Sequence, residues 1–245
     1  MDTRRFLVIL AATLAAALPL AAEQPRPLFN GRDFSGWKVP AGDNGHWKVI
    51  DGVIDYDAAS EAAGDKSLWT ERSYRDFVLR LDWRIKATPY VNPNVFIIRH
   101  NGSHKKDAEG RDIRLSVPDS DSGIYLRGST KAQVNIWGWP IGSGEVYGYR
   151  TDQAMPAAVR AAVTPVRHAD RHIGEWNTFD ITLRGTRLTV VLNGLTVIRD
   201  AELPGVPAEG PIGLQHHGAR KDGVWTSPPS LVQFRNISII ELPSK

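Results

Sequence analysis

The 245-residue sequence contains no cysteine, so it can form neither disulfide bonds nor thiolate sites for zinc or iron–sulfur clusters. It also contains no run of five like charges, and 30 Lys and Arg residues are balanced by 27 Asp and Glu residues. Such interspersed charge is typical of a solvated surface and does not favour a nucleic-acid partner. Its longest apolar stretch is shorter than the ~20 residues of a membrane-spanning helix.

Residues 1–22 have the pattern of a secretory signal. Two arginines precede an apolar stretch over residues 6–18, and Ala21-Ala22 comes before a polar segment. No cysteine follows, which excludes a lipoprotein anchor. We therefore expect cleavage after Ala22 and export of residues 23–245 to the periplasm or the extracellular space, with no membrane segment left in the mature chain.

Period-two alternation dominates the mature chain. Residues 77–85 place Phe, Leu, Leu, Trp and Ile on one face and polar residues on the other, which predicts a long strand with one buried face. Asn193-Gly194 between residues 187–192 and 195–198 predicts a two-residue hairpin. We predict further strands over residues 47–50, 52–56, 95–99, 123–127, 132–137, 179–184, 211–217 and 232–241.

Helical signals are rare. Only residues 156–163, which begin with proline, indicate a short helix. Many short strands separated by Gly, Pro and Asn turns predict an all-β fold, an antiparallel β-sandwich or jelly roll, as a single domain over residues 23–245. Residues 87–120, rich in Pro, Asn, Gly and charge, are interpreted as a long inserted loop, and such loops on rigid sandwiches often carry binding sites.

The strand faces opposite the predicted core are unusually rich in charged, amide and aromatic side chains. They present Arg80, Asp82, Arg84, Tyr125, Arg127, Gln133, Asn135, Trp137, Gln215 and His217. A sugar site uses these residue types, because amides and charges form directional hydrogen bonds to hydroxyls and aromatic rings cover the apolar side of a pyranose. The alternative is a polar network that braces a curved sheet.

The segment over residues 137–152 interleaves four glycines and four aromatic residues around Glu145. A carboxyl surrounded by aromatic rings has its pKa raised by desolvation, as proton transfer at neutral pH requires. The alternative is a structural loop in which Glu145 pairs with Arg150 or another arginine.

Two segments contain incomplete metal-binding patterns. His168 and His172 are four residues apart but are flanked by Pro and Gly and have no third ligand nearby. Asp119 and Asp121 precede Gly123 as in calcium loops, without the later acidic ligands of an EF-hand. For Asp121, a calcium ligand, a substrate contact and a turn residue all stay open, and no residue is assigned to a metal.

Ordered blocks over residues 28–37, 122–127, 174–177, 210–218 and 234–237 resemble those of the 3-keto-disaccharide hydrolase domain, a family of exported bacterial proteins. The resemblance covers about residues 27–241. It implies a concanavalin-like lectin/glucanase jelly roll. It also implies action on glycosides that are oxidised to a ketone at C3.

A C3 ketone acidifies the C2 proton, so such an enzyme needs a base, an acid, and a cationic or metal group that stabilises the enolate. On this hypothesis, Glu145 and His217 transfer protons and Arg127 stabilises the oxyanion. Sugar binding is assigned to Asp82, Arg84, Asp121, Tyr125, Gln133, Trp137, Arg150 and Gln215. No cofactor is assigned, and a divalent metal such as calcium stays open.

Two rival functions use the same fold. One is a non-catalytic, lectin-like carbohydrate-binding module, since a jelly roll serves either purpose. The other is a two-carboxylate glycosidase, which ranks lower because no strand presents paired acids on one face. In each case the expected partner is a small-molecule sugar, and the sequence carries no indication of the oligomeric state.

Overall fold

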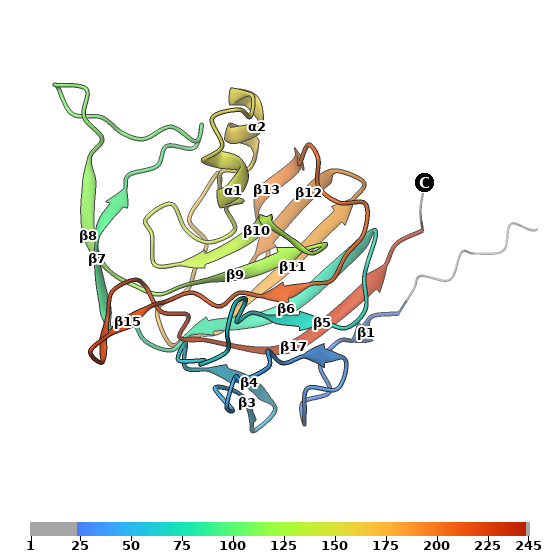
Figure 1. Cartoon of the computed structure of the whole chain (residues 1–245). Coiled ribbons are helices and arrows are strands. Elements are labelled where there is room, and N and C mark those ends of the chain that lie inside the picture. The colour runs from blue at the N-terminus through green and yellow to red at the C-terminus, as the bar shows by residue number, and fades with distance from the viewer. Residues whose placement is uncertain (1–23, 244–245) are drawn as a thin grey trace, which may run out of the picture.

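The computed structural model describes residues 24–243, and the predicted signal peptide lies outside them. Within this range, eight strands form a large antiparallel sheet in the order β13-β12-β11-β6-β17-β4-β3, with β1 paired to β17 (Figure 1). Its strands are β1 (Arg26–Pro27), β3 (Trp47–Ile50), β4 (Val53–Tyr56), β6 (Phe77–Ile85), β11 (Asn177–Arg184), β12 (Arg187–Leu192), β13 (Leu195–Glu202) and β17 (Val232–Glu241).

A small sheet of five antiparallel strands, in the order β10-β9-β14-β5-β2, packs against the large sheet. Its strands are β2 (Trp37–Lys38), β5 (Leu68–Thr70), β9 (Asp121–Leu126), β10 (Ser129–Trp137) and β14 (Gly213–Leu214). Two separate hairpins are formed by β7 (Tyr90–Phe96) with β8 (Arg114–Asp119), and by β15 (Arg220–Lys221) with β16 (Val224–Trp225). The predicted antiparallel β-sandwich is confirmed.

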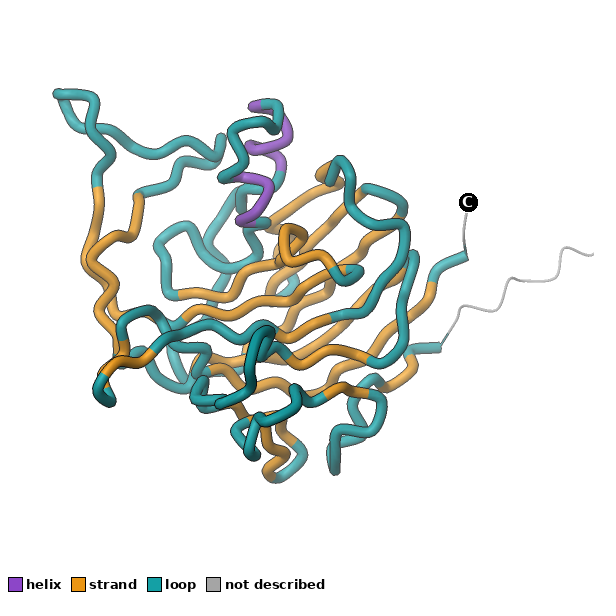
Figure 2. Tube along the Cα trace, in the orientation of Figure 1, coloured by secondary structure: helices purple, strands orange, loops and turns teal. Residues whose placement is uncertain are grey.

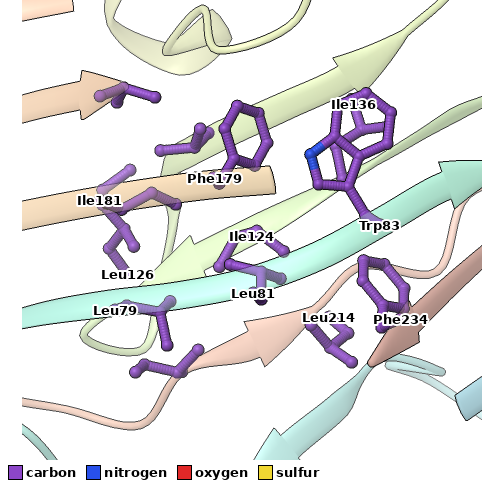
Figure 3. Close-up of a cluster of buried hydrophobic side chains, with 14 of the residues drawn as sticks. Leu79, Leu81, Trp83, Ile124, Leu126, Ile136, Phe179, Ile181, Leu214 and Phe234 are labelled. Atoms are coloured by element: carbon purple, nitrogen blue, oxygen red, sulfur yellow. The ribbon is translucent and has the colours of Figure 1, made fainter. Parts of the chain in front are cut away.

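The core lies between the two sheets and follows the predicted alternation. Every second residue of β6, from Phe77 to Ile85, is buried. Figure 3 shows Leu81 and Trp83 of β6 with Phe179 of β11, close to side chains of the small sheet that include Ile124. Each fully buried side chain of this size contributes about 1.5–3 kcal/mol of hydrophobic stabilisation. This core carries the stability of a chain without disulfides.

The segment predicted as a long loop contains the β7–β8 hairpin, which projects from the sandwich (Figure 2). Its register shifts between Asn92 and Val95, so Pro93 lies at an irregularity where a missing N–H is tolerated. The strand pair was not predicted from the sequence, because proline argues against a strand.

The helices are short. Helix α2 (Ala157–Ala162) follows Pro156 as predicted, whereas α1 (Tyr147–Arg150) was not predicted. No helix within residues 24–243 is both long and apolar enough to cross a membrane.

Candidate functional site

The outer face of the small sheet gathers most of the predicted polar residues. Tyr125 of β9 lies opposite Gln133 of β10, and Asp121 lies opposite Trp137, while Ile124, Val134 and Ile136 between them belong to the core. Residue Gln215, just after β14, continues the row, because its backbone N–H donates to Gly123. The structure therefore brings five of the predicted sugar-binding residues onto one face.

Two further segments extend this face. Residues 144–146 pair with the edge of β10, because Gly144 and Glu145 exchange backbone hydrogen bonds with Asn135. Trp69 of β5 lies opposite Gly213 at the other side of the sheet. Neither placement follows from local sequence pattern, since β5 has three residues and the pairing of residues 144–146 is non-local.

Stacked aromatic rings form the floor at one side. The Trp69 and Tyr125 rings are 5.3 Å apart and inclined by 14°. A Cβ on Gly213 would lie 2.7 Å from the Trp69 ring, so glycine is required for this ring to lie against the sheet. Trp69 was not predicted as a site residue. Its ring is half exposed and offers an aromatic surface to a ligand.

Burial raises the pKa of Tyr125 to about 12, which keeps its hydroxyl protonated at neutral pH. The phenol is therefore a permanent hydrogen-bond donor on this face.

An amide network fills the middle of the face. The Gln133 Nε2 group donates to Ser122 O at 3.2 Å and to the side-chain oxygens of Asn135 and Gln215. A Cβ on Gly123 would lie 2.5 Å from that nitrogen, so glycine makes room for it. The Gln133 Nε2 group is occupied by other protein groups, as the bracing-network alternative requires.

Asp121 and His217 lie together at the edge of this network. Asp121 is partly exposed, but its Oδ1 atom is buried and has no hydrogen-bond partner within residues 24–243. Burial raises the pKa of Asp121 to about 7, and repulsion from Asp119 and Glu145 adds to the rise, while attraction to His217 acts against it. Asp121 therefore holds its proton to a higher pH than an ordinary aspartate does.

His217 is held in one orientation. Its Nδ1 lies 2.6 Å from Pro228 O, and a carbonyl oxygen only accepts, so Nδ1 carries the proton. In the neutral ring, Nε2 is then the acceptor. The backbone supports this arrangement, because Asp121 N–H donates to Pro229 O and His217 N–H donates to Ser230 Oγ at 2.9 Å.

Glu145 is fully buried and its Oε1 accepts from Arg150 Nε. Its Oε2 atom has no partner within residues 24–243. Burial raises the pKa of Glu145 to about 7, although the Arg150 guanidinium acts against the rise. The alternative considered from the sequence, a Glu145–Arg150 ion pair, is present.

The inserted hairpin completes the Glu145 environment. Arg150 Nη1 lies 3.3 Å from His104 Nε2, and His104 Nδ1 lies 3.1 Å from Asp112 Oδ2. Asp121 and Glu145 come from different segments of the chain, but they lie close enough for the charge of Glu145 to raise the pKa of Asp121.

Trp137 is a packing residue. It is 3% exposed and its ring stacks on Trp139 at 4.2 Å. Ile98 and Ile141 pack on the same cluster, which joins the inserted hairpin to β10. A buried ring of this kind offers little surface to a sugar.

Arg127 does not join the site. It lies six positions after Asp121, just past the end of β9, a span of about 20 Å at ~3.3 Å per residue. Its guanidinium donates to Asp76 Oδ1 at 2.9 Å, Gly185 O at 2.7 Å and Pro207 O at 3.0 Å, and the residue is buried. The expected oxyanion role beside Glu145 and His217 is wrong on this geometry, because a left-handed backbone at Arg127 (φ 50°) ends the strand alternation.

Asp82 and Arg84 also lie outside the candidate site. Both lie on the outer face of the large sheet, so the core separates them from Asp121. Asp82 accepts from Thr178 Oγ1 at 2.7 Å, and Arg84 Nε donates to Gln233 Oε1 at 2.6 Å. The alternation correctly predicted which residues face outward. It did not distinguish the outer face of the large sheet from that of the small sheet.

Within residues 24–243, no three His, Asp or Glu side chains come together in a way that could hold a metal ion. Asp119, in the calcium-like segment, accepts hydrogen bonds from Asn92 Nδ2 and Trp139 Nε1, each at 2.9 Å. His168 and His172 are exposed. Neither incomplete metal-binding pattern in the sequence therefore brings three such side chains together within the described residues.

An antiparallel sandwich whose outer face combines stacked aromatics, amides, a carboxyl and an imidazole has the residue types of a carbohydrate-active domain. Residues 24–240 match the family described as the 3-keto-alpha-glucoside-1,2-lyase-like domain. The chain belongs to this family, which confirms the resemblance found in the sequence.

Solved structures share the fold. One proposed glycosyl hydrolase of Parabacteroides distasonis is 22% identical, with a TM-score of 0.57, over 89% of this chain and 84% of its own. A second from the same organism is 19% identical, with a TM-score of 0.54, over 91% of this chain and 96% of its own. No curated protein sequence matches the chain.

Proposed function

We propose that the protein cleaves 3-keto-glycosides by elimination across C1 and C2, followed by hydration of the product. The observation that carries this proposal is Asp121, a partly exposed acid with a pKa of about 7 beside the oriented imidazole of His217. Family membership supports it, because the family is described by a 3-keto-glucoside 1,2-lyase reaction.

The proposed reaction needs no external oxidant. A base takes the C2 proton, which the C3 ketone acidifies, and the electron pair forms the C1–C2 double bond through an enolate. The C1–O bond then breaks, and the leaving oxygen receives a proton from an acid. Water adds across the double bond to give the free 3-keto sugar.

Asp121 is suited to be the base, because a pKa near neutral gives both an ionised population and useful basicity. Protonated His217 supplies the proton to the leaving oxygen through Nε2, the nitrogen that its Pro228 contact leaves available. The Tyr125 hydroxyl donates to the enolate oxygen, and the Trp69 ring covers the apolar side of the sugar.

Glu145 takes an indirect part in this proposal. It is fully buried, so it acts on Asp121 through its charge: when Glu145 ionises, it holds the pKa of Asp121 up. Arg150 and His104 set its position, which links the inserted hairpin to proton transfer.

Incubation with a 3-keto-α-glucoside and with its unoxidised parent, each with and without chelator, tests the proposal. We expect release of the aglycone from the keto compound alone, at the same rate with chelator. Equal cleavage of the parent would instead identify a glycosidase that hydrolyses through its carboxyls. Loss of activity with chelator would show that a metal ion takes part.

A carbohydrate-binding module is the second candidate, and the half-exposed Trp69 ring, which stacks on Tyr125, favours it. Calorimetric binding of the unoxidised glucoside, without turnover of either compound, would support this alternative. In either case we propose that the protein acts outside the cytoplasm, on the strength of its predicted signal peptide.

A further inference from the structure

A cavity lies away from Asp121, on the outer face of the large sheet. It has a volume of about 940 Å³. Three paired residues on neighbouring strands form its floor: Thr182 of β11 lies between Val78 of β6 and Thr189 of β12. Figure 1 shows these strands side by side in the large sheet. Val206 and Leu242 line its walls. We call this cavity the arginine groove.

Four arginines line the arginine groove, together with only two acids, so the lining has an excess of positive charge. They are Arg75, Arg127, Arg184 and Arg187, with Asp76 and Asp200. Arg127 pairs with Asp76 at 2.9 Å, and Arg187 lies 3.5 Å from Asp200. Within residues 24–243, the guanidinium groups of Arg75 and Arg184 form no hydrogen bond or ion pair with any other residue.

The arginines of the groove also repel one another. Burial lowers the pKa of Arg127, and the charge of Arg75 lowers it further, while Asp76 acts against both. The Nε atom of Arg127 is buried without a hydrogen-bond partner within the described part of the chain. An anion in the groove would relieve this repulsion and pair with the two uncompensated guanidinium groups.

We propose that the arginine groove binds an amphipathic organic anion. The acid group lies against Arg75 and Arg184, since these guanidinium groups have no partner of their own. The apolar body lies on Val78 and Leu242. The ligand needs both an acid group and an apolar body. A simple anion would leave the apolar lining without contacts, and a neutral hydrocarbon would leave the guanidinium charges unpaired.

Fluorescence titration with 1-anilinonaphthalene-8-sulfonate, a sulfonate on an aromatic body, tests this proposal. We expect one saturable site per chain. Arg184→Gln or Arg75→Gln should weaken binding about tenfold, equivalent to ~1.4 kcal/mol, in line with the loss of one charge-assisted hydrogen bond. Ala208→Trp should abolish it by filling the groove without changing charge.

Arg111→Gln is the matched control, because it removes the same charge from the tip of the inserted hairpin, away from the groove. It should bind the dye as the wild type does, and so should Asp121→Asn. The melting temperature of each variant shows that it has folded.

Competition identifies the ligand chemistry. Octanoate should displace the dye, whereas octanol, which lacks the charge, and acetate, which lacks the apolar body, should not. Displacement by octanol or acetate as effective as by octanoate would overturn the proposal. Unchanged binding in Arg75→Gln, Arg184→Gln and Ala208→Trp, or equal weakening in Arg111→Gln, would also overturn it.

Discussion

The outer faces of the two sheets have similar residue types but different chemical character. Around Asp82 and Asp180 on the large sheet the polar groups are paired: Arg80 Nη1 donates to Asp180 at 2.8 Å, and Asp82 accepts from Thr178 and Asn236, each at 2.7 Å. On the small sheet, Asp121 keeps a buried oxygen without a partner and has a pKa of about 7. A desolvated carboxyl without a partner distinguishes the candidate site from the surroundings of Asp82 and Asp180, whereas residue type alone does not.

Replacing one acid on each outer face should give the largest difference in catalytic rate. Asp121→Asn removes the proposed base and should lower kcat/KM on a 3-keto-α-glucoside by about 10²–10⁴-fold, the usual contribution of general base catalysis. Asp180→Asn, on the large sheet, should leave the rate unchanged. Aglycone release measures both. Equal rates for the two variants would remove Asp121 from the mechanism.

Breaking a buried ion pair should affect stability far more than breaking an exposed one. Glu145→Ala leaves Arg150 buried without its partner and should lower the free energy of unfolding by about 3–5 kcal/mol. Asp180→Ala breaks an exposed pair with Arg80 and should cost ~1 kcal/mol or less. Urea unfolding measures both variants, and a small effect for Glu145→Ala would contradict the buried pairing.

Stability should fall as the pH rises between about 4 and about 7. Asp121 and Glu145 have folded-state pKa values of about 7, above their ordinary values of 3.8 and 4.5. In that window these two carboxyls bind more protons in the folded chain than in the unfolded chain. Together they outweigh His216, whose pKa burial lowers to about 4 and which acts in the opposite direction, so the free energy of unfolding decreases with pH. Urea unfolding at several pH values should show this slope, and Asp121→Asn with Glu145→Gln should flatten it. Asp180→Asn should retain the slope, and an equal slope in all variants would contradict the raised pKa values.

A smaller effect is expected from the exposed aromatic rings. Trp69→Ala removes the ring that stacks on Tyr125 and should weaken sugar binding by a few-fold to about tenfold, in line with ~0.5–1.5 kcal/mol for an aromatic contact. Trp176→Ala, between Arg84 and Arg235 on the large sheet, should leave affinity unchanged. Calorimetry with the 3-keto-glucoside distinguishes them, and equal loss in both variants would argue against a site on the small sheet.

The sequence predicted what depends on local periodicity. The alternation over Phe77–Ile85 placed β6 and its buried face correctly, and Asn193-Gly194 marked the β12–β13 turn. It could not show that Asp121 and Glu145 interact, because residues 144–146 pair with β10 only in the folded chain. It could not separate Asp82 from Asp121 either, since alternation gives inward and outward faces but not which sheet a strand joins.

Isotopic substitution at C2 of the sugar tests the central claim most directly. With a C2-deuterated 3-keto-α-glucoside, the account predicts a primary isotope effect on aglycone release, loss of the deuterium to water, and strong suppression of both release and loss in Asp121→Asn. Cleavage that retains deuterium at C2, or that proceeds in Asp121→Asn at the wild-type rate, would contradict elimination by Asp121 on the small sheet.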